Sequence, residues 1–138
     1  MTAHYLLDTN TVSYSIKGEP RVVRARMNAV PSSLVAISAF TQAELLFGLA
    51  KKPQAKRLCR EVEAFLGAFQ IFPWDSAAAR AYGEMRAAQE RKGLPLSHED
   101  LMIAAHALAL DLTLVTHDAA FAQVDGLRRE DWAVSPED

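Results

Sequence analysis

The sequence of 138 residues predicts one α/β domain built around a mostly parallel β-sheet. Short apolar runs of strand length alternate with longer stretches of helical periodicity, which is the pattern of successive βαβ units. Half of the residues are hydrophobic, and one core of this size buries roughly 68–70% of the extended surface. The chain is short for two domains, so residues 1–138 are expected to form a single domain.

Each predicted element follows from its local pattern. Four apolar runs have strand length and composition, namely Tyr5–Leu7, Leu34–Ile37, Gln70–Phe72 and Thr113–Val115. Helical periodicity fills the intervals and predicts helices over Thr11–Ile16, Pro20–Ala29, Ala39–Ala50, Gln54–Ala68, Ser76–Lys92 and Glu99–Leu110. A last short helix is expected after Asp118.

Capping and composition support three of these predictions. Asp75 is a good N-cap for the helix that starts at Ser76. The order Lys92, Gly93 and then Pro95 is typical of a helix end. The helix Glu99–Leu110 is apolar on nearly all sides, so it is expected to be central, with any polar residue at its start lying beside the core.

Composition excludes several classes of function. A formal net charge of −2 is not that of a general, avid nucleic-acid binder. The single cysteine, Cys59, excludes an internal disulfide, no Cys/His spacing indicates a zinc site, and Cys59 is expected to be a small buried residue. No apolar run approaches the roughly 20 residues of a membrane span, and the first residues do not resemble a signal peptide. A cytoplasmic protein is therefore expected.

Four carboxylates occupy comparable places in this scheme. Asp8 and Asp118 directly follow predicted strands, whereas Glu44 and Asp100 stand in the first turns of predicted helices. In an open parallel sheet these junctions face one edge, the edge at which ligands usually bind. The four side chains are therefore expected to converge there.

Helix capping is the alternative explanation for each carboxylate alone. Asp8 and Asp118 are plausible N-caps, and Thr41–Glu44 and Ser97–Asp100 fit the capping-box pattern. Taken together, however, carboxylates gathered beside a core repel one another unless a cation or protons neutralise them. An all-oxygen site suits Mg²⁺ or Mn²⁺ rather than Zn²⁺, and Mg²⁺ held by carboxylates commonly serves phosphoryl chemistry. The pattern thus predicts phosphodiester hydrolysis by metal-activated water.

The sequence resembles the PIN-domain nucleases, whose acidic motifs occur here in order. The matching segments are Leu6–Asn10, Ile37–Leu45, Asp100–Ala105 and Leu114–Asp118, and the ending Gly126–Trp132 looks like that of the VapC toxins. The resemblance spans nearly the whole chain. It implies a three-layer α/β/α fold and Mg²⁺-dependent endoribonuclease activity, with Mn²⁺ as a possible substitute. It also implies neutralisation by a VapB-type antitoxin within a homodimer or larger assembly.

The same resemblance assigns roles to individual residues. The catalytic, metal-binding positions of the family are matched by Asp8, Glu44, Asp100 and, at a more variable fourth position, Asp118. Supporting polar positions are matched by Asn10 and Thr116. The acidic–Phe pair that often follows in the family is Ala120–Phe121 here, in a segment one residue shorter.

Three segments have a less specific similarity to particular VapC members, and this similarity concerns the RNA target. Val22–Met27, Ala77–Ala79 and the C-terminal ending look closest to VapC members that cut initiator tRNA in the anticodon stem-loop and so inhibit translation. Two basic groups are either RNA-backbone contacts or solvated helix faces. They are Lys51, Lys52, Lys56, Arg57 and Arg60 in one group and Arg21, Arg24 and Arg26 in the other.

Several residues near the motifs are less favoured as catalytic or RNA-binding residues. Glu99 is set aside in favour of Asp100, because adjacent helical residues point about 100° apart. His117 is a candidate for a phosphate contact. Trp74, Trp132 and Tyr82 are expected to serve packing rather than base stacking.

Two alternative functions stay open at this point. Asp8-Thr9-Asn10-Thr11 superficially resembles the nucleophile loop of haloacid-dehalogenase phosphatases, but Asn10 replaces the required second aspartate. A non-catalytic PIN-like module that binds RNA or protein is the other alternative, against which the retention of all four carboxylates argues.

Overall fold

The computed structural model describes residues 2–135 and has a sheet of five parallel strands at its centre, in the order β3-β2-β1-β4-β5. The strands are β1 (Tyr5–Leu7), β2 (Val35–Ser38), β3 (Gln70–Phe72), β4 (Thr113–Val115) and β5 (Arg129–Glu130). The α-helices are α1 (Thr9–Lys17), α2 (Arg21–Ala29), α3 (Ala39–Ala50), α4 (Lys56–Ala68), α5 (Ser76–Lys92) and α6 (His98–Leu110). Short 3₁₀ turns, η1 and η2, span Ser32–Leu34 and Ala119–Gln123.

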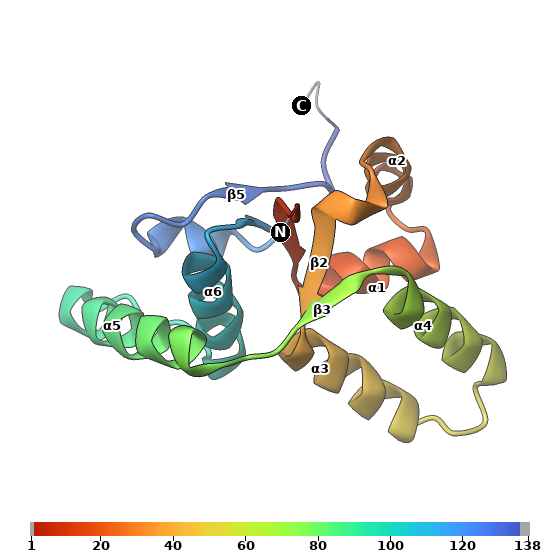
Figure 1. The fold of residues 1–138 in the computed structure, drawn as a ribbon, viewed down its shortest axis with the longest axis horizontal. Helices are drawn as coiled ribbons and strands as arrows, with labels where there is room; N and C mark the ends of the chain where they lie inside the picture. Colours follow the sequence, from red (N-terminus) through yellow and green to blue (C-terminus); the bar gives the residue numbers. More distant parts are fainter. Residues whose placement is uncertain (1, 136–138) are drawn as a thin grey trace.

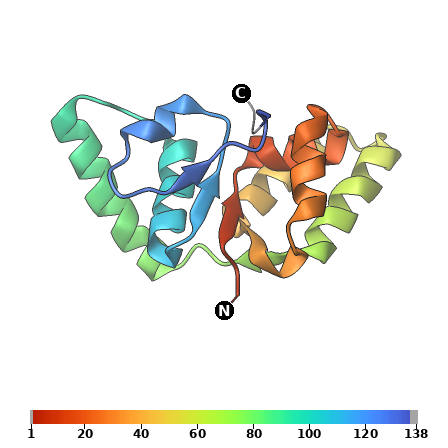
Figure 2. The same cartoon turned by 90° about the horizontal axis from the view of Figure 1, so that it is seen from above.

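Helices cover both faces of the sheet (Figures 1 and 2), with α1, α2 and α4 on one side and α5 and α6 on the other. Neighbouring strand residues therefore point into different cores, because side chains alternate between the faces of a strand. In β1, Leu6 packs with the α5/α6 core and Leu7 with the core formed by α1 and α4. Burial on both faces explains why the strands are continuous apolar runs rather than alternating ones.

The central position predicted for the last long helix is confirmed. Six residues of α6 are buried, and α6 packs closely along α5. The predicted ends of α5 are confirmed as well. The Asp75 side chain accepts a hydrogen bond from Ala78 N at 3.1 Å, and Gly93 ends the helix with a φ of 69°, a left-handed conformation that glycine adopts without strain.

Several local expectations differ from the structure. β5 was not predicted, α1 begins at Thr9 rather than Thr11, and Leu34 belongs to η1 rather than to β2. The short helix expected after Asp118 is present, as the 3₁₀ helix η2 rather than as an α-helix. Cys59 is only partly buried, because its position on α4 leaves the side chain at the edge of the core. Among residues 2–135, no helix is long and apolar enough to cross a membrane.

Candidate active site

Three of the four predicted carboxylates meet beyond the ends of the central strands. Asp8 follows β1, Glu44 lies on α3 directly after β2, and Asp100 lies in the first turn of α6. All three line one pocket of about 160 Å³, which we call the acidic pocket. Its other lining residues are Thr9, Asn10, Glu99 and Ile103. The topology of the sheet thus brings together residues separated by more than ninety positions of sequence.

Asp8 caps a helix and also lines the acidic pocket. Its side chain is 8% exposed and accepts a hydrogen bond of 2.8 Å from Thr11 N, so it is the N-cap of α1. Its own backbone N–H donates to Val115 O at 3.1 Å, which ties the carboxylate to the end of β4. Asp8 is therefore held rigidly at the pocket by bonds that use only one of its carboxylate oxygens.

The capping-box interpretation of Glu44 is wrong. The N-cap of α3 is Ser38, whose hydroxyl accepts from Phe40 N at 3.0 Å, because the helix begins directly after β2. Glu44 lies more than a turn into the helix, where its Oε1 accepts a short hydrogen bond from the Thr9 hydroxyl. The Thr9 and Thr41 hydroxyl oxygens lie 3.3 Å apart, so Thr9 links α1 to α3 at the site.

Thr9 is the residue that the sequence analysis did not single out. Its position within the Leu6–Asn10 segment was visible, but its contact with Glu44 depends on the spacing between α1 and α3. Glu99, which was set aside, also lines the acidic pocket, since it and Asp100 both lie in the first turn of α6.

Asp100 is the carboxyl group most affected by this environment. Burial, followed by the negative charge of Asp118, raises its pKa above the ordinary value, and Asp8 and Glu99 add to the effect. A hydrogen bond with Ser97 opposes the shift in pKa without cancelling it. The backbone N–H of Asp100 donates to Ser97 Oγ at 3.1 Å, so Ser97 caps α6 as expected.

Asp118 lies close enough to act on Asp100 electrostatically but does not line the acidic pocket. It is exposed, and its side chain caps η2 by accepting from Ala120 N at 2.9 Å. The buried Thr116 hydroxyl accepts from Asp118 N at 3.1 Å, which fixes the backbone there. The neighbouring His117 places Nδ1 2.7 Å from an Asp131 carboxylate oxygen.

The donor set fits a hard divalent cation such as Mg²⁺. Carboxylate oxygens dominate the pocket, and burial together with the neighbouring negative charges raises the pKa of Asp100, so a bound cation would favour its charged form. Within residues 2–135, no group of three or more His, Cys, Asp or Glu side chains is arranged so that it could hold a metal ion. Mg²⁺ usually keeps several waters and binds through one or two carboxylates and the substrate phosphate, so this open arrangement suits it.

Replacing Asp100 by Asn is expected to stabilise the metal-free protein at neutral pH. An acid whose folded pKa is raised destabilises the fold above that pKa, and the penalty disappears as pH falls below the unfolded value of about 3.8. Thermal unfolding in EDTA should therefore give a higher Tm for Asp100→Asn at pH 7, with the difference shrinking toward pH 4. A variant less stable than the wild type throughout would contradict the repulsion described above.

Comparison with known proteins identifies the family. The PIN domain model matches residues 5–127, and the chain belongs to the PIN-domain family. Within that family it belongs to the VapC ribonuclease toxins of VapBC systems. The tRNA(fMet)-specific endonuclease VapC of Salmonella typhimurium is 37% identical over 129 residues, which are 93% of this chain and 97% of that protein. Ribonuclease VapC2 of Rickettsia felis is 32% identical over 93% of this chain and 97% of that protein.

Solved structures confirm the three-layer α/β/α fold. DNA-bound VapBC from Salmonella typhimurium aligns with a TM-score of 0.87 and 37% identity, covering 94% of this chain and 98% of that one. VapBC2 from Rickettsia felis bound to a promoter DNA fragment aligns with a TM-score of 0.85 and 32% identity, covering 93% and 98%. The resemblance noted from the acidic motifs is therefore confirmed at the level of family and fold.

Proposed function

We propose that this VapC-family ribonuclease cuts tRNA, with initiator tRNA as the favoured target, in a reaction that requires Mg²⁺ or Mn²⁺. The observation that carries the proposal is the convergence of Asp8, Glu44 and Asp100 on one pocket. The proposed target draws on two relatives at 37% identity, from Salmonella typhimurium and Shigella flexneri, both named tRNA(fMet)-specific endonuclease VapC. Cleavage within the anticodon stem-loop would block translation at initiation.

The roles proposed for individual residues follow from their contacts. Asp8, Glu44 and Asp100 would hold the cation, one or two of them directly and the rest through bound waters, with Asp118 adding negative charge at its edge. The cation supplies a water activated for attack and neutralises charge on the phosphate. Thr9 orients the Glu44 carboxylate, and Thr116 fixes the backbone at Asp118. Asn10 is exposed at the pocket, where its amide can reach a bound RNA strand.

The partners proposed for this chain are those seen with similar proteins. The similar structures from Salmonella typhimurium and Rickettsia felis are VapBC assemblies bound to DNA. We accordingly assign this chain a VapB-type antitoxin and a homodimer or larger toxin–antitoxin assembly, acting in the cytoplasm where tRNA is used. Residues 1–138 would form one PIN domain, of which the family model covers residues 5–127.

Purified protein freed of antitoxin is expected to cut initiator tRNA when Mg²⁺ or Mn²⁺ is added and to stop when EDTA is added. The products should be read by sequencing RNA ends, with an elongator tRNA as the matched substrate control. Equal cleavage in EDTA would refute the metal dependence. Cleavage of both tRNAs at equal rates would refute the preference, and RNA binding without cleavage would favour the non-catalytic alternative. A phospho-aspartyl intermediate at Asp8 would support the phosphatase alternative instead.

A further inference from the structure

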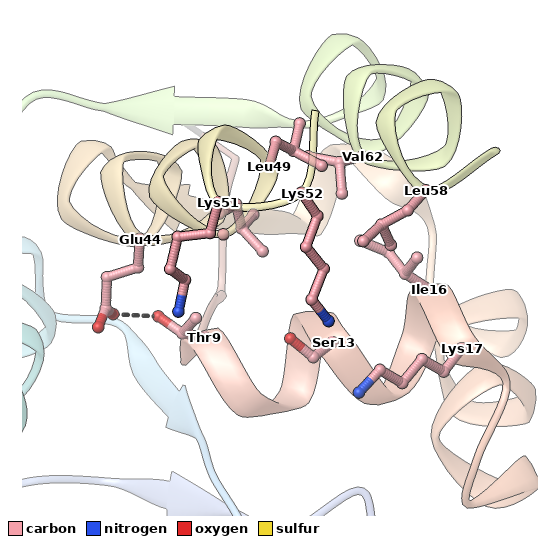
Figure 3. A pocket seen from close by; sticks show the side chains of 12 residues that line it. Thr9, Ser13, Ile16, Lys17, Glu44, Leu49, Lys51, Lys52, Leu58 and Val62 are labelled. Carbon is pink, nitrogen blue, oxygen red and sulfur yellow. Dashed lines mark hydrogen bonds between the residues drawn. The ribbon is translucent and has the colours of Figure 1, made fainter. Parts of the chain in front are cut away.

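A second pocket opens beside the acidic one, between α1, α3 and α4, and we name it the lysine pocket (Figure 3). Its volume is about 230 Å³, and it lies next to the acidic pocket, because Thr9 and Glu44 line both. Its wall is apolar, and three lysines stand at its rim. The wall consists of Ile16, Leu45, Leu49, Leu58 and Val62, and the rim of Lys17, Lys51 and Lys52.

The three lysines converge on one side of the pocket. Lys51 and Lys52 reach from the end of α3 toward Thr9 and Ser13 of α1, and Lys17 comes from the last turn of α1 (Figure 3). All three are exposed, and in the described part of the chain none of them lies within 4 Å of a carboxylate oxygen. Lys51 lies over the Phe47 ring, 4.6 Å from its centroid. Three ammonium groups at one rim, none of them in an ion pair within the described residues, outnumber the single Glu44 carboxylate of the pocket and form a site for a polyanion.

Several of the other basic residues are already engaged within the fold. The Arg24 guanidinium donates to the carbonyl oxygens of Ser15 and Ile16, at 2.9 and 2.8 Å, at the end of α1. Arg26 lies over the Trp132 ring and 3.6 Å from a Glu130 carboxylate oxygen. Arg57 pairs with Glu61 one turn along α4. The lysine pocket therefore offers Lys17 and Lys52, for which no such contact is seen, and Lys51, whose ammonium group contacts only the exposed Phe47 ring.

We propose that the lysine pocket holds the RNA strand next to the phosphate that is cut. Lys17, Lys51 and Lys52 would bind backbone phosphates, the Ser13 hydroxyl would donate to one of them, and the apolar wall would receive a base or ribose. This inference rests on the proposed function and identifies where the substrate runs. The position of the lysine pocket beside the acidic one favours RNA over an acidic protein, because a strand cut beside Glu44 would pass Thr9, which lines both pockets. A local basic surface also explains how a protein of net charge −2 retains RNA.

The test measures RNA binding separately from cleavage. Labelled bulk tRNA is titrated in EDTA onto Asp8→Asn protein, with and without Lys17→Ala/Lys52→Ala, over a series of salt concentrations. Loss of two phosphate contacts should raise Kd and lower the slope of log Kd against log salt by about 1 per lysine. The matched control is Arg80→Ala/Arg91→Ala on α5, which removes the same charge from exposed positions away from both pockets.

Each outcome of this titration has a defined meaning. A larger Kd and smaller slope in the lysine variant alone, with unchanged Tm, supports the inference. Equal effects of the lysine and arginine pairs, or no effect of either, overturn it. Binding of poly-glutamate through Lys17 and Lys52, with tRNA binding unaffected, assigns the pocket to an acidic protein and also overturns it. Failure of the wild type to cleave would refute the proposed function and leave this binding result intact.

Discussion

Changing Asp8 to Asn is expected to reduce RNA cleavage by more than about a hundredfold while leaving the fold as stable as that of the wild type. Changes in the residues that merely support metal ligands typically cost 10–100-fold, and loss of a ligand should cost more. The cap of α1 survives, because Asn is as good an N-cap as Asp and can still accept from Thr11 N. The two roles of Asp8 are therefore separable by one pair of substitutions.

Asp8→Ala is the matched second variant. It removes the charge and the cap together, so its unfolding free energy should fall below that of Asp8→Asn by about 1 kcal/mol. Cleavage of initiator tRNA in Mg²⁺ and urea unfolding of both variants check the prediction. Full activity in Asp8→Asn would show that the carboxylate only caps the helix.

The helices and four of the five strands could be predicted from the sequence because their patterns are local. β5 could not, because Arg129–Glu130 carries no apolar pattern and is a strand only through its pairing with β4. The start of α1 was misplaced by two residues, since the capping role of Asp8 moves the helix directly against β1. Such differences arise where tertiary pairing or capping overrides periodicity.

The candidate site was predictable to a similar degree. The meeting of Asp8, Glu44 and Asp100 follows from the rule that strand-to-helix junctions share one edge of the sheet. The contact between Thr9 and Glu44 was not visible, because it requires the distance between two helices. The sequence also did not show that Arg24 is bound within the fold whereas Lys17 and Lys52 make no ion pair among the described residues.

A buried histidine joins the two helices that carry site carboxylates. His106 of α6 is 1% exposed, and its Nδ1 lies 2.8 Å from the hydroxyl oxygen of Ser38, the N-cap of α3. Ser38 Oγ also accepts from Phe40 N, so its own hydrogen is available to His106 Nδ1, an arrangement that favours the neutral ring. His106 Nε2 is buried without a well-formed hydrogen bond, although the Pro73 carbonyl acts on the ring.

Replacing His106 by Ala is expected to lower the unfolding free energy by roughly 2–5 kcal/mol, the range for emptying a well-packed core position. The change also removes a hydrogen-bond partner of buried Ser38, which adds to the cost. Urea unfolding at pH 7.5 measures the loss. His106→Gln, which retains a polar side chain, should lose less, and equal losses would show that only packing matters.

The difference in Tm between the wild type and His106→Gln is expected to depend on pH. Burial lowers the pKa of His106 below its ordinary 6.5, although the Asp75 carboxylate and the Pro73 carbonyl favour the charged ring. A base with a lowered folded pKa contributes stability that is fully present above the unfolded pKa and is lost as pH falls toward the folded one. Wild-type Tm should therefore approach that of His106→Gln as pH is lowered from about 7.5 to about 5. The raised pKa of Asp100 acts in the opposite direction, but it is common to both proteins and cancels in the difference. A gap that stays constant or widens over this range would mean that His106 takes up its proton within the folded protein.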